Sequence, residues 1–465
     1  MTARVIETLE AVARRRPGAV ALRWEGRSLT YGRLDRLAGG FARFLHHHGV
    51  RPGDRVAVAI GNRWTFPVAL LGGWKLGATV APLDVRLTGD ERAAILRDLQ
   101  PAAVVHEVVG DEAEWLSPPV GTPALILYTS GSTGAPKGAV LSQRAVAFGV
   151  ASWIDPVMAL TPEDVVLAVL PLSHSYGLNG ALLAPLAAGA SVVLVERFSP
   201  EAVIAAVREH GVTVFPGVAT MFRRLLEAGR DRDALRRLRL AVAGAAPCPW
   251  SLVTEWRERT GGRVLRGYGM TEVFRPVSYR AREEDDRPDS VGRPVPGVEV
   301  RVVDDEDRPL PPDATGELLI RSPAVMDGYL GAPEETRAVL QEGWFRTGDL
   351  AAVSPDGHVR IEGRKRERIL RGGHSVFPPE VEAVLAAHPA VAEAAVVGVP
   401  DADLGEEVVA YVVPQAGACL DVAELLAWCR ARLAAFKAPR EVRVVPALPR
   451  SATGKVLKSA LAAER

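Results

Sequence analysis

The sequence has little of what holds small secreted proteins together or attracts nucleic acid. It contains three cysteines in 465 residues, at positions 248, 419 and 429, and no C-x-x-C pair. This number and spacing argue against a disulfide framework and against a cysteine-ligated zinc cluster. Lys and Arg total 56 and Asp and Glu also total 56, so the formal net charge is zero. A neutral chain exerts no long-range attraction on nucleic acid or anionic lipid, and we expect a cytoplasmic protein without a nucleic-acid partner.

A membrane-spanning segment is also not expected. The first 18 residues mix charged and apolar positions and lack an apolar core, which argues against a secretory signal. No charged residue occurs between Asp164 and Glu196, but two prolines and three glycines interrupt the part of this stretch that follows Leu170. A buried helix followed by a strand over residues 191–195 explains the stretch better than a bilayer helix.

What the chain does contain is a regular series of apolar runs separated by helical patterns. Apolar residues make up 48% of the sequence, which is enough for a sizeable core. Strand-like runs without polar alternation occur at residues 55–60, 124–129, 165–170, 212–217 and 238–246. Such runs are typical of parallel strands covered on both faces by helices, so we predict an α/β fold with two α/β subdomains. Valine-rich runs near 298–305 and 316–322 predict an appended β-barrel-like unit.

The composition changes at the charge-dense segment GRKRERILRGG, residues 363–373. The helix and strand patterns that follow predict a small α+β domain of about 100 residues. We therefore expect a large domain over residues 1–363, a hinge over residues 364–366, and a small mobile domain over residues 367–465. Within the basic segment, Arg368 and Arg371 are expected to be solvated.

The segment LILYTSGSTGAPKGAVLS, residues 125–142, carries the strongest chemical signal. An apolar strand ends in a loop of glycines and small hydroxyl residues that includes one lysine. Backbone N–H groups in such a loop can surround an anion, and the lysine adds a positive charge, so the loop is predicted to bind phosphate. It is not a Walker A loop, because its spacing differs. The predicted phosphate-binding residues are Thr129, Ser130, Gly131, Ser132, Thr133, Gly134 and Lys137.

This loop resembles the signature loop of the adenylate-forming superfamily, which comprises acyl-CoA synthetases, nonribosomal-peptide adenylation domains and luciferases. The resemblance continues in order along almost the whole chain, and acyl-CoA synthetases are the most similar group. The segments that carry it are PLSHSYG (171–177), GAAP (244–247), GYGMTE (267–272), GWFRTGDL (343–350), GRKRERI (363–369), GGHSVFPPEVE (372–382) and SATGKVLK (451–458).

The resemblance implies a nucleotide site built from several of these segments. Adenine would lie against the small residues Gly244, Ala245 and Ala246, and the ring of Tyr268 would stack on it. Gly267, Gly269, Met270 and Thr271 would complete this nucleotide site.

Other residues of these segments are implied to act on the ribose, the metal and the reacting groups. Asp349 and Arg364 would bind the ribose. Glu272 would hold Mg²⁺ as a hard oxygen ligand, the alternative being a Thr–Glu pair that caps a helix. His174 would lie beside the substrate carboxylate, and Thr271 and Lys137 would act on the phosphates.

The implied reaction has two steps. A carboxylate attacks the α-phosphorus of ATP to give an acyl-adenylate and pyrophosphate, and a thiol then displaces AMP. Lys455 would serve the first step only and leave when the small domain rotates, unless it is a solvated lysine like Lys458. The acceptor is either coenzyme A or the phosphopantetheine arm of an acyl carrier protein. Phe436 and Lys437 are candidate contacts for the coenzyme A nucleotide, the alternative being surface packing.

The sequence also indicates which class of carboxylic acid is the substrate. Amino-acid-activating members of the superfamily carry an aspartate around PLSHSYGLNG that pairs with the α-ammonium group, but no acidic residue occurs here between Asp164 and Glu196. Because an unpaired buried ammonium is costly, the resemblance implies a plain carboxylic acid, aliphatic or aromatic. Candidate pocket residues are Tyr176, Val218, Met221, Val273, Phe274 and Arg275. Arg275 could pair with a second carboxylate of a diacid, but it is expected to be exposed.

Overall fold

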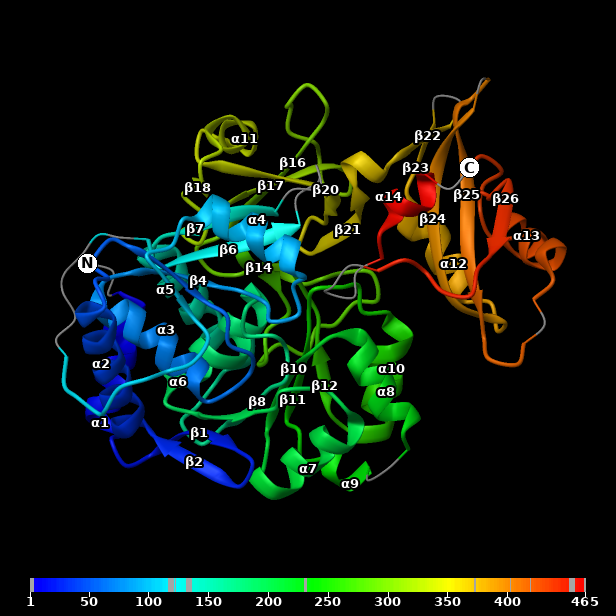
Figure 1. Ribbon diagram of the computed structural model, residues 1–465. Coiled ribbons are helices and arrows are strands. Elements are labelled where there is room, and N and C mark those ends of the chain that lie inside the picture. The colour runs from blue at the N-terminus through cyan, green and yellow to red at the C-terminus, as the bar shows by residue number, and fades with distance from the viewer. Residues whose placement is uncertain are drawn as a thin grey trace. The chain divides into compact units, whose positions relative to one another are not determined.

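The structure of the protein is a computed structural model (Figure 1). Two compact units are present: the first consists of Met1–Val300 and Ile320–Phe345, and the second of Arg301–Leu319 and Arg346–Arg465. The structure describes residues 4–115, 121, 123–130, 136–229, 232–371, 374–401, 403–418, 420–450 and 456–463.

The first unit contains a seven-stranded sheet in the order β12-β11-β10-β8-β9-β1-β2. Neighbouring strands from β12 to β1 are parallel, and the β1–β2 pair is antiparallel. The predicted parallel strands are thus confirmed. The strands are β1 (Val20–Trp24), β2 (Arg27–Thr30), β8 (Val165–Ala168), β9 (Ser191–Leu194), β10 (Val214–Gly217), β11 (Leu240–Ala243) and β12 (Arg263–Leu265).

Helices cover this sheet, as Figure 1 shows for α7, α8 and α10. Their apolar side chains form one buried cluster with β10, β11 and β12, in which Phe215, Phe222 and Trp256 are the largest fully buried members. The strands of this sheet are apolar along their whole length because both faces of the sheet are removed from water. The helices are α7 (Pro200–His210), α8 (Ala219–Glu227), α9 (Arg232–Leu235) and α10 (Trp250–Thr260).

A second sheet of the same unit has six strands in the order β18-β7-β6-β4-β3-β5. Strands β6, β4, β3 and β5 are parallel, whereas β7 pairs antiparallel with β6 and β18 pairs antiparallel with β7. Lys137 therefore lies on a strand, because it pairs with Thr129 across the β6–β7 hairpin, and the prediction of a loop at this residue was wrong. The strands are β3 (Arg55–Val58), β4 (Thr79–Pro82), β5 (Ala103–Val105), β6 (Leu125–Ser130), β7 (Pro136–Leu141) and β18 (Gly328–Tyr329).

The uncharged stretch before Glu196 also lies in the first unit. This stretch forms β8, the buried helices η2 and α6, and β9, as the sequence predicted. Within the described residues, no helix has the length and apolar character needed to cross a membrane. These helices are α1 (Val5–Arg15), α2 (Tyr31–His47), α3 (Thr65–Leu76), α4 (Gly89–Leu99), α5 (Gln143–Ser152), η1 (Trp153–Met158), η2 (Gly177–Leu183), α6 (Ala184–Ala188) and α11 (Pro333–Val339).

A small antiparallel sheet, β13-β14-β15, also belongs to the first unit. It consists of β13 (Gly267–Met270), β14 (Phe274–Ser278) and β15 (Arg293–Pro294).

A further sheet has the order β16-β17-β20-β19, with β21 paired to β20. Its strands form no closed barrel in the described part of the chain, so the predicted barrel-like unit is an open sheet. They are β16 (Glu299–Val303), β17 (Gly316–Arg321), β19 (Leu340–Gln341), β20 (Trp344–Val353) and β21 (Val359–Arg364).

The C-terminal part of the second unit confirms the predicted α+β pattern. Its sheet has the order β23-β22-β25-β24, with β26 paired to β25, and helices α12 and α13 share its apolar core. The division into units falls at residues 345 and 346, and the hinge at residues 364–366 stays a prediction. The elements are η3 (Lys365–Glu367), β22 (Ile369–Arg371), β23 (His374–Val376), α12 (Pro378–Ala386), β24 (Val391–Asp401), β25 (Gly405–Pro414), α13 (Val422–Arg430), β26 (Glu441–Val444) and α14 (Lys458–Ala463).

One buried charge joins the first three helices. The side chain of Lys75, on α3, is 2% exposed, and its Nζ lies 2.7 Å from Glu10 on α1 and 2.9 Å from Asp35 on α2. Replacing Lys75 by Met leaves the two carboxylates without their cation. We expect a loss of about 3 kcal/mol in the free energy of unfolding, measured by urea denaturation, because one partner of a buried pair is removed. A loss below about 0.5 kcal/mol would contradict this role.

Candidate active site

The predicted phosphate-binding residues lie on the β6–β7 hairpin as far as they are described. Thr129 and Ser130 end β6, and Lys137 follows on β7. Gly131, Ser132, Thr133 and Gly134 lie outside the described residues. Helix α5 begins after this hairpin, and the side chain of Ser142 caps it by accepting a hydrogen bond from the N–H of Ala145.

The GAAP segment follows strand β11, at the carboxyl edge of the seven-stranded sheet, where ligands bind in open α/β sheets. A Cβ atom at Gly244 would lie 2.8 Å from the ring of Tyr176, so only glycine fits there. Ala245 has a φ of +64°, and it and Ala246 are exposed. The segment thus offers a turn of small side chains to solvent.

Thr271 and Glu272 lie in the turn between β13 and β14. A strand follows this turn, so the alternative interpretation as a helix cap is wrong. Tyr268 lies half-buried on β13, paired with Val277. Phe274 opens β14 with a φ of +56°, which is costly for a bulky residue and is found mainly at sites that constrain the backbone.

Glu272 contacts a residue that the sequence analysis did not single out. The hydroxyl of Tyr329, on β18, donates a 2.9 Å hydrogen bond to Glu272 Oε1. Among the described residues nothing is hydrogen-bonded to Glu272 Oε2. A half-buried carboxylate with one oxygen held and one left for a ligand suits Mg²⁺, which uses one or two carboxylates together with phosphates.

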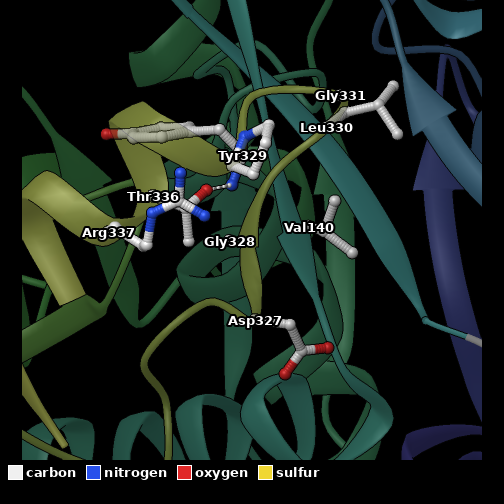
Figure 2. A pocket seen from close by; sticks show the side chains of 9 residues that line it. Val140, Asp327, Gly328, Tyr329, Leu330, Gly331, Thr336 and Arg337 are labelled. Carbon is white, nitrogen blue, oxygen red and sulfur yellow. Dashed lines mark hydrogen bonds between the residues drawn. The ribbon is translucent and has the colours of Figure 1, made fainter. Parts of the chain in front are cut away.

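The strand that carries Tyr329 borders an open hollow of about 450 Å³ (Figure 2). Its lining includes Val140, Asp327, Thr336 and Arg337. The backbone N–H of Tyr329 donates to Thr336 Oγ1 over 2.9 Å, which Figure 2 marks with a dashed line. Burial raises the pKa of Asp327 from its usual value, although Arg144 opposes the shift.

His174 has a carboxylate partner that the sequence analysis missed. Its Nε2 lies 3.0 Å from Oδ2 of Asp84, which follows the buried strand β4. Arg86 donates to the same carboxylate over 2.6 Å and 3.0 Å. Burial alone would raise the pKa of Asp84, but the hydrogen bonds from His174 and Arg86 outweigh it and hold the pKa well below its usual value. The position of Asp84 after a buried strand was the available signal.

Arg275 is buried, so the expectation of an exposed side chain was wrong. Its Nε donates to Ser278 Oγ and its Nη1 to the carbonyl oxygen of Ala243, both over 2.9 Å. The guanidinium lies 4.9 Å from the ring centre of Trp153. Burial lowers the pKa of Arg275 to about 10, so it remains a cation at neutral pH. Among the described residues no carboxylate pairs with it.

In the second unit, Asp349 and Arg364 face each other. They are paired in register across β20 and β21, and Arg364 Nε lies 3.4 Å from Asp349 Oδ1. The side chain of Asp349 is 8% exposed. The two residues predicted to bind ribose are thus brought together by one strand pair.

Two segments implicated in the thiol step also meet in the second unit. The rings of His374 and Phe436 stack with their centres 4.6 Å apart. Lys437 Nζ lies 2.7 Å from Glu380 Oε1. Lys455 lies outside the described residues; Arg450 and Val456, on either side of the segment 451–455, form a β-bridge.

Three basic residues expected in solvent have acidic partners. Arg371 is 17% exposed and its Nε lies 2.6 Å from Glu407, so the interpretation as a solvated linker residue was wrong for it. Arg368 lies 3.6 Å from Asp305 and its side chain is 24% exposed. Lys458 is 19% exposed and lies 2.7 Å from Glu382. The description of Lys458 as a solvated lysine was therefore also wrong.

Comparison with known proteins agrees with this layout. A family model of the AMP-binding enzyme matches residues 9–121 and 111–330, and one of the AMP-binding enzyme C-terminal domain matches residues 380–455. Feruloyl-CoA synthase from an Amycolatopsis species is 36% identical over 96% of this chain and 96% of that protein. Indoleacetate–CoA ligase from Aromatoleum aromaticum is 35% identical over 95% and 94%. O-succinylbenzoate coenzyme A synthetase from Bacillus subtilis, solved with ATP and magnesium, has a TM-score of 0.89 at 30% identity, over 98% of both chains.

The chain therefore belongs to the AMP-binding enzyme family, as its motifs predicted. It is an AMP-forming acid–thiol ligase. The enzyme uses ATP and Mg²⁺ to activate a carboxylic acid as an acyl-adenylate, and then forms the thioester with coenzyme A. Loading of a carrier protein, the alternative acceptor, is not favoured by these relatives.

The contact between Asp84 and His174 leads to a pH-dependent prediction. Asp84→Asn should lower the free energy of unfolding by about 1–2 kcal/mol at pH 7, because it removes charge-assisted hydrogen bonds. Since folding lowers the pKa of Asp84, its stabilisation is present above the unfolded pKa, about 4, and is lost as the pH falls through the folded pKa. Urea denaturation should show the same difference between the two proteins at pH 7 and pH 5, and a smaller difference at pH 3. A constant difference would contradict this assignment.

Proposed function

We propose that the first half-reaction takes place at the strand ends where the β6–β7 and β13–β14 hairpins carry Lys137, Thr271 and Glu272. The observation that supports this proposal most is the pair of contacts that Tyr329 makes with Glu272 and with Lys137. A carboxylate and a triphosphate repel each other, so their reaction needs cations, donors and correct positioning more than a protein nucleophile.

The nucleotide is proposed to bind along several segments. The 129–134 segment, with Lys137, holds the phosphates through backbone N–H groups and the ammonium. Adenine lies against Gly244–Ala246 and the ring of Tyr268, and Gly267, Gly269 and Met270 form the neighbouring strand. Asp349 accepts hydrogen bonds from the ribose hydroxyls, and Arg364 donates to the ribose or phosphate oxygens.

The reacting groups are proposed to be neutralised by separate side chains. Glu272 Oε2 holds Mg²⁺, which neutralises phosphate charge when bound. Thr271 donates its hydroxyl to a phosphate oxygen. His174, oriented by Asp84, lies beside the acid carboxylate and donates to it.

The acid is proposed to bind beside Tyr176, Trp153 and Arg275. The rings of Tyr176 and Trp153 stack with centres 5.6 Å apart and give an apolar wall. A buried guanidinium without a carboxylate partner is costly, and an anionic or strongly accepting group at the far end of the acid would compensate it. We therefore propose an acid that lacks an α-ammonium group and carries such a distal group.

Coenzyme A is proposed to approach the second unit. The stacked pair His374 and Phe436 offers an aromatic surface next to Lys437, which suits a nucleotide with phosphate groups. The free thiols of Cys248 and Cys429 agree with a reducing compartment, and we propose that the enzyme works in the cytoplasm.

The proposed function is tested by product analysis. The purified protein is incubated with ATP, Mg²⁺, coenzyme A and a panel of carboxylic acids, and pyrophosphate, AMP and acyl-CoA are measured. We expect the three products in equal amounts with at least one acid. Pyrophosphate release without acyl-CoA, but with loading of a carrier protein, would overturn the choice of acceptor.

The role proposed for Lys455 separates the two half-reactions. Lys455→Ala should slow adenylation by about 10²-fold or more, because it removes a cation from the reacting phosphate and carboxylate. Thioester formation from a supplied acyl-adenylate should change little. Pyrophosphate exchange and acyl-CoA formation measure the two steps separately.

Lys458→Ala is the matched control for Lys455→Ala. It removes a nearby lysine that is already paired with Glu382 and Glu367, so adenylation should stay within about twofold of the parent protein. If Lys455→Ala slows both half-reactions equally, or leaves adenylation intact, the proposed two-state cycle is wrong.

The role proposed for Arg275 is tested with pairs of acids of equal length, one carrying a distal carboxylate and the other a methyl group. Arg275→Met should lower kcat/KM at least tenfold for the dicarboxylic acid, because a buried ion pair is lost. It should change kcat/KM little for the other acid. An equal fall with both acids, together with a lower melting temperature, would instead assign Arg275 a structural role.

A further inference from the structure

Tyr329 lies at a junction of three segments that are far apart in the sequence. It belongs to β18, which pairs with β7, and it is placed opposite Ala139, two residues beyond Lys137. Its hydroxyl reaches Glu272 in the β13–β14 turn. The backbone fixes this geometry on both sides: the N–H of Leu330 donates to the carbonyl oxygen of Gly138, and the N–H of Met326 donates to that of Glu272, each over 2.8 Å.

The side chain of Tyr329 makes two different contacts. Its hydroxyl donates to Glu272 Oε1 over 2.9 Å, and Lys137 Nζ lies 5.4 Å from its ring centre. The phenolic hydroxyl is an uncharged hydrogen-bond donor. A neutral donor holds the carboxylate without cancelling its charge.

These contacts separate two opposite charges that would otherwise attract each other. Glu272 and Lys137 approach the same aromatic side chain, one at its hydroxyl and the other at its ring. A direct ion pair between them would occupy both the carboxylate oxygen and the ammonium. Among the described residues they form no such pair, so Glu272 Oε2 and the ammonium both stay available to ligands.

We propose that Tyr329 is a positioning residue for adenylation: its hydroxyl orients Glu272 for the metal, and its ring holds Lys137 for the phosphates. This inference rests on the metal-binding role proposed for Glu272. Removing the hydroxyl leaves the carboxylate free to rotate out of its orientation for the metal, whereas the ring and its contact with Lys137 remain. In this proposal Tyr329 acts through Glu272 and Lys137.

The experiment compares Tyr329→Phe with the parent protein. ATP binding is measured by calorimetry with and without Mg²⁺, a readout that does not depend on turnover. The increase in ATP affinity that Mg²⁺ produces should fall about tenfold in the variant, the size expected when a hydrogen bond to a charged group is lost. ATP binding without Mg²⁺ should stay within about twofold, because the ring and its contact with Lys137 remain.

Tyr128→Phe is the matched control. Tyr128 also donates its hydroxyl to a carboxylate over 2.6 Å, but that carboxylate belongs to Asp98, which has no proposed role in metal binding. It should not change the Mg²⁺ dependence. If both variants reduce the Mg²⁺ effect and the melting temperature alike, Tyr329 acts through stability only and the inference is wrong.

The variant Glu272→Gln distinguishes an error in the positioning role of Tyr329 from an error in the metal site itself. If Glu272→Gln leaves the Mg²⁺ effect intact, the metal site itself is wrong. If Glu272→Gln abolishes the effect and Tyr329→Phe does not reduce it, only the positioning role is wrong. In the double variant, Tyr329→Phe should add no further loss, because the carboxylate that it positions is already gone.

Discussion

Repulsion between a carboxylate and a triphosphate is the constraint that shapes this protein. Both groups are anions, and the reaction brings an oxygen of one to the α-phosphorus of the other. The protein has to supply positive charge and donors at one place without letting them pair among themselves. In the proposed site, separate segments carry Lys137, Glu272 and His174; Tyr329 contacts the first two, and Asp84 contacts His174.

The fold supplies these positions through hairpins added to parallel sheets. The parallel strands end at one edge, where short turns such as GAAP can approach a ligand closely. The antiparallel pairs β6–β7 and β13–β14 then carry charged side chains beyond that edge. Backbone strain is found in the second of these hairpins, at Phe274, where the chain has to turn directly after Glu272.

The sequence predicted the elements of the fold well because their apolar pattern is local. Buried parallel strands such as β8 and β11 show as continuous apolar runs. The predictions from sequence failed for charged side chains whose burial or pairing depends on residues far along the chain. Arg275 and Lys458 were assigned to solvent, although the structure buries one and pairs the other with Glu382. Charged residues carry no local signal that tells an exposed side chain from a partnered one.

The lack of a local signal also explains why two residues of the proposed site, Asp84 and Tyr329, could not be predicted from the sequence. The glycine-rich and Thr–Glu motifs are compact in sequence and could be recognised, and Asp349 was found with its neighbour Arg364. Asp84 contacts His174 and Tyr329 contacts Glu272, over separations of 90 and 57 residues. Such supporting residues become visible only when the fold brings them to the motif.

The most direct test of acyl-adenylate formation follows the carboxylate oxygen that the substrate acid transfers to AMP. A substrate acid labelled with ¹⁸O in both carboxyl oxygens is turned over with ATP, Mg²⁺ and coenzyme A, and the products are weighed by mass spectrometry. Attack of the carboxylate on the α-phosphorus predicts one ¹⁸O in AMP, one in the acyl-CoA and none in pyrophosphate. Unlabelled AMP together with labelled phosphate products would contradict an acyl-adenylate and the site derived from it.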